Sequence, residues 1–323
     1  MKRGINLMMI LLMVTPFFAF AQDPATTVDK SRNWKIANKA SITITQSGFR
    51  NWADGSENSM SLGSFDNFTA YYSKNRYIFD SYINLAYGTM WQESVDEWRK
   101  TDDKIDIMAN DIWKFKVDNP HWFYGVLFTL NSQFADGYKY PDNEPRQFVS
   151  TFFSPAYINL APGVTYRIGE RFSWVFSPAN MQALIIANKD IANAGIYGNK
   201  VKGDASAGND NLKGEQIKLG LGIFSEIRWA QPLTKGIDID TKLRITNNYL
   251  DPRTKNRWNF DVNYMLLLNF AITKYLSANL RLELVYDDDV KTKAPKVAGG
   301  DPTPILQVKE ILGIGFAWNI SNE

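Results

Sequence analysis

Few side chains in this chain could do chemistry. Its 323 residues include one histidine, His121, and no cysteine. His121 stands between Pro120 and Trp122 in a predicted short turn, where a surface role is favoured over catalysis. Hydrolases that use Ser–His or Asp–His pairs need an imidazole within hydrogen-bond reach of the reacting group. We therefore predict no catalytic residue and no enzyme, since nucleophilic catalysis would need a lysine or carboxylate base.

Carboxylates are the second group with chemical potential, and they gather in polar segments between predicted strands. Oxygen ligands of this kind suit Ca²⁺ or Mg²⁺. The alternative is a solvated loop whose acids pair with nearby lysines and arginines, and the lack of EF-hand spacing favours it. No other cofactor is predicted. The candidate divalent-cation ligands at the rim are Asp251, Asp287, Asp288 and Asp289.

The elements around these residues follow a period of two. Within 258–286, Tyr264, Leu266 and Leu268 alternate with Asn263 and Asn269, and the pattern resumes after the turn at 273–275. Such alternation predicts strands with one apolar and one polar face. About twelve segments show it: 35–46, 59–73, 77–91, 103–117, 122–134, 155–167, 172–187, 214–229, 237–249, 258–272, 276–286 and 305–320. Pro162 and Pro178 predict irregularities in two of them.

Connection lengths also alternate along the chain. Tight turns fall near 74–76, 118–121, 168–171, 230–235 and 273–275, while long polar segments fill the other gaps. Short periplasmic turns and long extracellular loops are typical of an outer-membrane β-barrel. Trp and Tyr near predicted strand ends fit two interfacial girdles. We therefore predict an all-β, transmembrane, antiparallel up-and-down β-barrel; a soluble periplasmic β-sandwich is the alternative.

If the apolar face meets lipid, the charged face meets the lumen. Both signs are interspersed there, so that neighbouring strands can pair opposite charges. The predicted lumen charges are Lys218, Glu226, Arg228, Asp238, Asp240, Lys242, Arg244, Asp261, Arg281, Glu283 and Lys309. Apolar Met265, Leu267, Val285 and Ile311 would also point inward, which predicts a narrow or closed lumen. The long loops 135–154 and 188–213 could cap it further, although the second is polar enough to be mobile.

The N-terminus carries a basic pair, Lys2 and Arg3, then an apolar run and Ala19-Phe20-Ala21. This predicts a secretory signal peptide over 1–21, a short periplasmic segment over 22–34 and the barrel over 35–323. The formal charge of +2 becomes neutral without Lys2 and Arg3, which gives no support for nucleic-acid binding. The mean hydropathy is −0.30, so only the alternation indicates a membrane protein.

Several ordered segments resemble an outer-membrane family of the Bacteroidota known as a domain of unknown function (number 3078). The clearest is Asn51-Trp52-Ala53-Asp54-Gly55-Ser56-Glu57-Asn58-Ser59. The family more often has Ala-Gly-Gly where this chain has Ala53-Asp54-Gly55-Ser56, a small departure. Others lie at 99–108, 154–168, 248–251, 286–291 and 309–316. The resemblance implies an outer-membrane barrel and no activity.

We predict a multi-pass protein of the bacterial outer membrane with a structural or accessory role. Its predicted partners are outer-membrane lipid and lipopolysaccharide, the barrel assembly machinery during insertion, and an envelope protein that the sequence does not identify. A narrow diffusion channel for small polar solutes or ions is the alternative, and an outer-membrane hydrolase is disfavoured. The last strand, with Phe316, Trp318 and Ile320 on one face, is similar to the terminal strands that barrel assembly machinery recognises.

Overall fold

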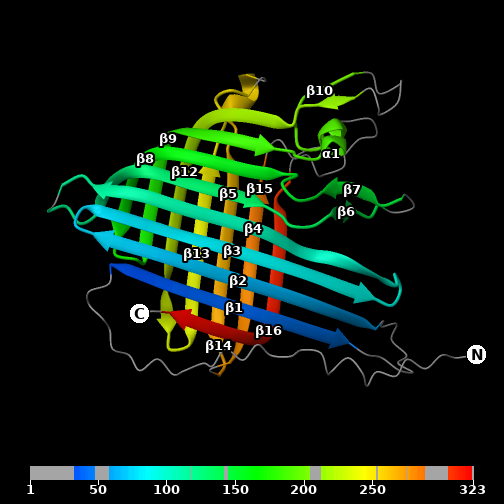
Figure 1. Cartoon of the computed structure of the whole chain (residues 1–323), viewed down its shortest axis with the longest axis horizontal. Coiled ribbons are helices and arrows are strands. Elements are labelled where there is room, and N and C mark those ends of the chain that lie inside the picture. The colour runs from blue at the N-terminus through cyan, green and yellow to red at the C-terminus, as the bar shows by residue number, and fades with distance from the viewer. Residues whose placement is uncertain are drawn as a thin grey trace, which may run out of the picture.

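Twelve antiparallel strands close into a ring in the computed structural model (Figure 1). The structure describes residues 33–47, 58–116, 118–141, 145–203, 212–251, 254–273, 275–287 and 305–321. The predicted signal peptide and the segment 51–57 lie outside them. The strands of the ring are β1 (Trp34–Ser47), β2 (Ser59–Lys74), β3 (Tyr77–Gln92), β4 (Glu97–Lys114), β5 (Trp122–Ser132), β8 (Ala156–Ile168), β9 (Phe172–Ile185), β12 (Ile217–Thr234), β13 (Ile237–Thr246), β14 (Asp261–Ala271), β15 (Leu276–Tyr286) and β16 (Gln307–Ser321).

The ring is an up-and-down barrel, because strands that follow one another in the chain are hydrogen-bonded neighbours. It closes where β16 pairs with β1, from Ala37 opposite Ser321 to Ile42 opposite Phe316. The strands of the front wall cross those of the back wall in Figure 1, as steeply tilted barrel strands do. The predicted fold class is confirmed.

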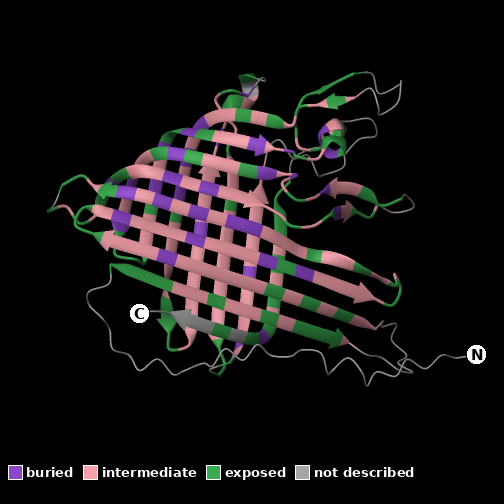
Figure 2. Ribbon diagram, in the orientation of Figure 1, coloured by how far each residue is buried: buried purple, intermediate pink, exposed green. Residues whose placement is uncertain are grey.

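The register fixes which face each side chain takes. Leu266 pairs with Leu282 and Leu268 with Leu280, whereas Leu267 pairs with Arg281. Directly opposed residues of an antiparallel pair lie on the same face of the sheet. Leu219 and Leu312, from the predicted apolar faces, are each 70% exposed. Arg281 is buried. Buried positions recur along the strands of the front wall (Figure 2).

Two irregularities lie where the prolines predicted them. The β8–β9 register shifts between Leu160 and Val164, and the β9–β12 register shifts between Gly222 and Phe224. Ser177 donates a side-chain hydrogen bond of 2.7 Å to the carbonyl of Pro162. The Ser177 hydroxyl thus supplies a hydrogen bond to a carbonyl within the shifted part of the β8–β9 pairing.

Three boundaries differ from the prediction. β4 begins at Glu97 rather than at 103, and its register with β3 shifts between Gly88 and Thr89. Residues 97–102 are mostly polar and lack the apolar alternation of a lipid-facing strand. The sequence therefore did not predict that they extend the β3–β4 hairpin. β12 continues to Thr234 through Pro232. Trp258 lies in the 3₁₀ helix η3 (Thr254–Trp258), before β14 begins.

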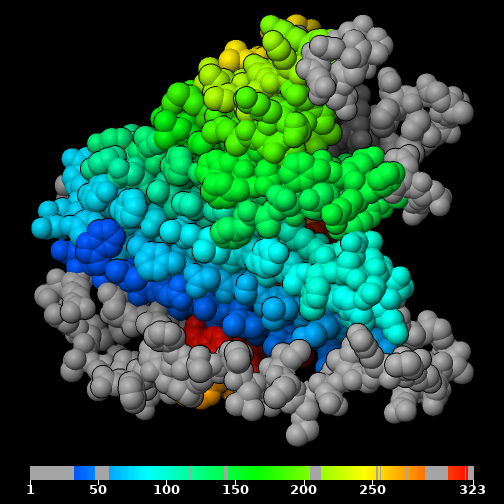
Figure 3. All heavy atoms as spheres, turned by 45° about the vertical axis from the view of Figure 1, so that its right-hand side comes forward, coloured from blue at the N-terminus to red at the C-terminus, as the bar shows by residue number. Residues whose placement is uncertain are grey.

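The long connections carry structure of their own. One holds β6 (Gly137–Lys139) and β7 (Gln147–Ser150), and another holds α1 (Lys189–Ala194), β10 (Val201–Lys202) and β11 (Lys213–Gly214). Asn188 caps α1, because its side chain accepts from the backbone N–H groups of Asp190 and Ile191. Ile191 packs with Leu184 and Ile186 at the end of β9. In Figure 3 the green atoms from the middle of the chain lie next to the cyan atoms of the strands that precede them. Among the described residues, no helix is long and apolar enough to cross a membrane.

Candidate functional site

The interior of the barrel is the candidate site, because it collects charged side chains that the strand alternation turns away from lipid. A cavity of about 1040 Å³ occupies the interior near the short turns. Its walls come from β1–β4, from the turn 168–171 and from β12–β15. Asn67 and Asn84 lie on one wall, and Asn269 and Asn279 lie on the other.

The predicted charges of β12 and β13 pair along that wall. Glu226 opposes Arg244 in the register, and their side chains lie 2.7 Å apart. Arg228 reaches Asp240 at 2.8 Å. Asp238 and Asp240 both line the cavity. Lys218 takes the same face of β12 as Glu226, and Asp261 opposes Thr246 at the start of β14.

Other ion pairs cross the interior instead of following one wall. Lys104 Nζ on β4 lies 2.8 Å from Glu283 Oε1 on β15. Arg281 Nη1 lies 3.0 Å from Asp102 Oδ2, and Arg281 Nε lies 3.0 Å from Glu283 Oε1. Lys309 on β16 reaches the other oxygen of Asp102. We call these five residues the charged layer; they join strands that are separated in the ring by β1, β2 and β3.

A second crossing contact lies beside the charged layer. Lys242 Nζ on β13 donates a hydrogen bond of 2.7 Å to Tyr82 Oη and lies 3.5 Å from Asp106 Oδ2. Tyr82 on β3 also packs with Met108, Leu127 and Phe224 in an apolar cluster inside the ring. β3 and β13 are six places apart in the ring of twelve strands, so this contact joins opposite walls.

The end of the barrel near the short turns is also filled along one wall. Arg167 on β8 pairs with Asp80 on β3 at 3.0 Å. Ile78, Ile112 and Phe123 pack together beside them, and Tyr71 packs against that cluster. Apolar residues and paired charges thus share the interior of the front wall.

His121 lies in the short connection between β4 and β5, as predicted. Its ring Nδ1 lies 2.9 Å from the carbonyl oxygen of Arg167. The centre of its ring is 5.6 Å from that of Tyr166. The imidazole therefore lies at the short-turn end of the barrel. Asp251 and Asp287 belong to the long connections after β13 and β15.

The candidate cation ligands are only partly described. Asp251 is buried, and its backbone carbonyl accepts a hydrogen bond of 3.0 Å from Arg257 Nε. Asp287 follows the end of β15. Asp288 and Asp289 lie outside the described residues. In the part of the chain that the structure describes, no three histidine or acidic side chains gather as a metal site would require.

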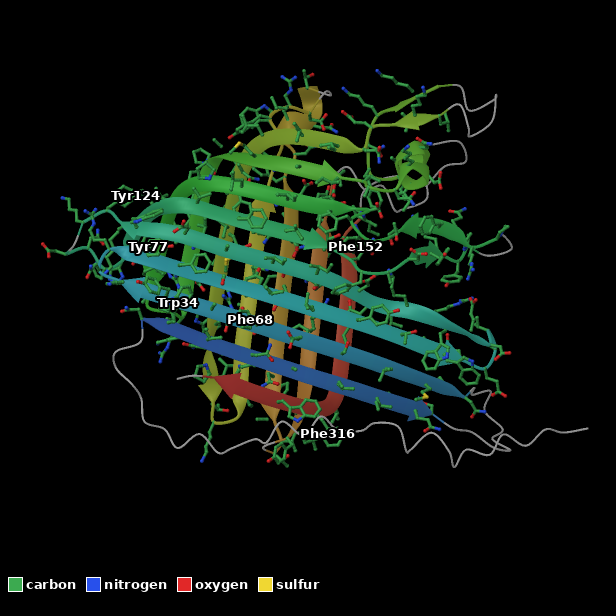
Figure 4. All side chains as sticks on the ribbon, viewed as in Figure 1. Trp34, Phe68, Tyr77, Tyr124, Phe152 and Phe316 are labelled. Carbon is green, nitrogen blue, oxygen red and sulfur yellow. The ribbon has the colours of Figure 1, made fainter. Side chains whose placement is uncertain are left out.

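Aromatic side chains form a belt on the outward face near the short turns, where Trp34, Tyr77 and Tyr124 mark neighbouring strand ends (Figure 4). Trp34 contacts Tyr72, Tyr72 contacts Tyr77, and the chain of contacts continues through Trp113 to Tyr124, with ring centroids 4.8–6.2 Å apart. Trp122 continues it to Tyr166 at 5.1 Å. Indole and phenol side chains prefer this depth because one end is apolar and the other polar.

Several interior residues did not figure in the sequence prediction. Asp80, Tyr82, Lys104 and Asp106 alternate with apolar residues in β3 and β4, so the period-two signal was available for them. Asp102 had no such signal. It was predicted to lie in a long loop, but it points inward because the bulge near Thr101 resets the alternation.

An even number of strands in a closed ring, an apolar outside, a charged inside and an aromatic belt define a class of protein. The chain is a multi-pass outer-membrane β-barrel.

Residues 44–138 match the model of a family described as "Protein of unknown function (DUF3078)". The resemblance on sequence is confirmed over that range. None of the curated proteins matches the chain.

Solved outer-membrane barrels are similar to the chain at low identity. The translocator domain of the autotransporter NalP from Neisseria meningitidis is 11% identical, with a TM-score of 0.35 over 90% of each chain. The COG4313 outer membrane channel from Pseudomonas putida F1 is 13% identical, with a TM-score of 0.38 over 93% of this chain and 99% of that one. The beta domain of the Bordetella autotransporter BrkA is 10% identical, with a TM-score of 0.35 over 89% of this chain and 99% of that one.

Proposed function

We propose that this protein is a closed outer-membrane barrel with a structural or accessory role in the envelope. The single observation that carries the proposal is the charged layer of Asp102, Lys104, Arg281, Glu283 and Lys309. It ties β4 to β15 and β16 across the interior. A barrel that conducts solute needs a continuous path of water, and the layer places five paired side chains between the two walls, which supports a closed barrel.

The layer is stabilised because each of its two carboxylates contacts two cations. Asp102 receives both Arg281 and Lys309, while Glu283 receives both Lys104 and Arg281. Separating the walls would leave carboxylates and cations unpaired in a partly dry interior, which is costly. Lys242, held between Tyr82 and Asp106, adds a second tie between opposite walls.

A narrow diffusion channel is the second candidate function. The cavity of about 1040 Å³ favours it, because its walls carry amides and charges of both signs. A polar solute could enter such a space from the side of the short turns. The charged layer would have to separate before the solute could cross.

An enzymatic function has little support. His121 lies beside the short turns, and its Nδ1 is occupied by the carbonyl of Arg167. The interior carboxylates are held in ion pairs, so they are poor candidates for a general base. Divalent-cation binding by Asp251 and Asp287–Asp289 remains a prediction, which calcium titration of the melting temperature would test.

Export and assembly complete the proposal. We propose that residues 1–21 direct secretion and that the barrel assembly machinery inserts the chain among lipid and lipopolysaccharide. Phe316 and Trp318 on the outward face of β16 support recognition of the last strand, since both are well exposed. An envelope protein that docks on the barrel is the natural partner of an accessory role.

Recording from the purified wild-type protein in planar lipid bilayers tests the proposal. A closed barrel predicts membranes that contain the protein and show no stable single-channel steps. Heat-modifiable gel migration of the same sample confirms that the protein is folded. Stable steps of uniform size would contradict the closed barrel and support the diffusion channel.

A further inference from the structure

The outward face of β1 and β2 carries a polar pair where lipid is expected. Asn38 Nδ2 donates to both oxygens of Asp66, at 3.0 and 3.2 Å. The register places Asn38 opposite Phe68 and Asp66 opposite Ala40. Asn67 and Thr69, the odd-numbered neighbours on β2, line the interior cavity. Trp34 and Tyr72 share the even-numbered face of Asn38 and Asp66 and belong to the outward aromatic belt, so that face points outward. Phe68, labelled in Figure 4, marks this part of β2.

The depth of Asp66 makes it unusual. It lies at the middle of β2 (Ser59–Lys74), between Tyr72 of the aromatic belt and the exposed Met60 near the other end. Ionisable side chains on the lipid face are most unfavourable near the middle of the bilayer. No water is present there to solvate a carboxylate, so a protein partner is the usual solution.

Asn38 meets only part of that need. A carboxylate offers about four acceptor positions, and Asn38 contributes a single NH₂ group. The charged layer does not help, because it lies on the other side of the sheet. Asp66 therefore retains acceptor capacity toward the outside of the barrel.

The surroundings allow a close approach by another protein. Ala40 and Ser64 are the small outward-facing residues next to the pair, being opposite Asp66 and Ile42 respectively. Ile42, Ile44 and Leu62 around them are 43–61% exposed. Small residues with a polar group at their centre and apolar residues around them are the usual composition of interfaces inside membranes.

We propose that this face, defined by Asn38, Ala40, Ser64 and Asp66, is a dimer interface with a second copy of the chain. The patch holds a donor, the NH₂ of Asn38 with its two N–H groups, and an acceptor, on Asp66, while Ser64 Oγ donates at 3.3 Å to the carbonyl of Tyr87 in the same chain. A two-fold interface uses the same patch on both subunits, so the patch must be complementary to itself. A donor from one copy can then reach Asp66 of the other. This interface is independent of whether the lumen is closed.

Single cysteines test the interface cleanly, because the chain has none of its own. The full-length Ala40→Cys protein is oxidised in native outer membranes and run on a non-reducing gel. We expect a band at twice the mass of the chain. The matched control is Leu268→Cys, which is outward-facing on β14, on another part of the ring. The control should remain monomeric under the same oxidation.

Adding Asp66→Leu to the Ala40→Cys protein tests the polar pair itself. The cross-linked fraction should fall about tenfold, the effect expected when a hydrogen bond to a charged group is lost. Heat-modifiable migration shows that this variant still forms the barrel. The dimer is overturned if Ala40→Cys stays monomeric, if it cross-links to a different protein, if Leu268→Cys dimerises equally, or if a folded Asp66→Leu variant cross-links undiminished.

Discussion

Arg281 illustrates how the interior holds charge at the scale of a residue. Its guanidinium is buried and contacts Asp102 on one side and Glu283 on the other. A planar guanidinium suits this position because it can bind two carboxylates in fixed directions. Arg281 could be predicted from sequence as an inward charge. Its partner Asp102 could not, because the bulge in β4 breaks the alternation that would have placed it.

Replacing Arg281 by alanine should destabilise the barrel. It would leave Asp102 and Glu283 with one lysine partner each, and losing hydrogen bonds to charged groups costs about 1.5–3 kcal/mol in the free energy of unfolding. Urea unfolding in lipid vesicles, followed by tryptophan fluorescence, measures the change. The same variant should show conductance steps in planar bilayers, since the charged layer loses its central cation.

Lys35→Ala is the matched control for that experiment. Lys35 and Glu170 form an ion pair of 2.9 Å, but both side chains are about half exposed. Exposed pairs contribute less than about 1 kcal/mol. A loss in Lys35→Ala equal to that in Arg281→Ala would contradict a special role for the charged layer.

Tyr197 is a residue outside the membrane whose ionisation can be followed. Its hydroxyl donates a hydrogen bond of 2.9 Å to the carbonyl of Val149. Burial raises the pKa of Tyr197 from 10.0 to about 12. The phenol is therefore protonated in the folded loop at a pH where the unfolded chain has already lost its proton. Its contribution to stability is complete below pH 10 and is lost as the pH rises toward about 12.

Proteolysis of the loop that contains α1 tests this effect. Cleavage of wild type should accelerate between pH 10 and 12, measured with a protease that remains active there. Tyr197→Phe lacks the hydroxyl, so it should be cleaved faster at neutral pH and show a smaller change over the same range. Identical pH profiles for the two proteins would show that Tyr197 does not hold the loop.

At the scale of the element, the strands followed from the sequence and the loop structures did not. Each strand repeats one contrast, apolar outside and polar inside, over ten or more residues. β6, β7, β10, β11 and α1 are two to six residues long. They depend on contacts between distant segments, such as Ile191 with Leu184 and Ile186. No local periodicity of apolar residues in the sequence predicts these short elements.

The closure of the barrel makes a prediction about β16. A Cβ added at Gly315 would lie 2.3 Å from the carbonyl oxygen of Ile42 on β1, a backbone atom that cannot move aside cheaply. At Gly313 the nearest atoms belong to the Thr43 side chain, at 3.4 Å. Gly315→Ala should therefore weaken the pairing of β16 with β1, while Gly313→Ala should be tolerated.

Heat-modifiable gel migration measures that difference. Gly315→Ala should shift from the folded to the unfolded band at a lower temperature than wild type, and Gly313→Ala should shift close to the wild-type temperature. Equal midpoints for the two variants would mean that the seam can adapt to a side chain at either position.

At the scale of the whole molecule, the face assignment connects the fold with its location. The outward residues of β12–β16 are mainly apolar, well exposed on β12 and β16 and partly exposed on β13–β15, while their inward neighbours form ion pairs. The pairing of β16 with β1 over Ala37–Ile42 closes the ring, as hydrocarbon requires of a spanning sheet. The number of strands and their inward faces could be predicted because both repeat around the ring. The crossing contacts between opposite walls could not, since pairs such as Lys104 and Glu283 depend on how the closed ring brings its walls together.

Spin labels at successive cysteines along β14, from Val262 to Phe270, measure the central claim most directly. Collision with oxygen, which dissolves in lipid, should be high at Val262, Tyr264, Leu266, Leu268 and Phe270 and low at the residues between them. Collision with a water-soluble nickel complex should not exceed oxygen collision at any of those five outward positions. The absence of a two-residue period, or high nickel access at Leu266 and Leu268, would contradict a barrel whose apolar face meets lipid.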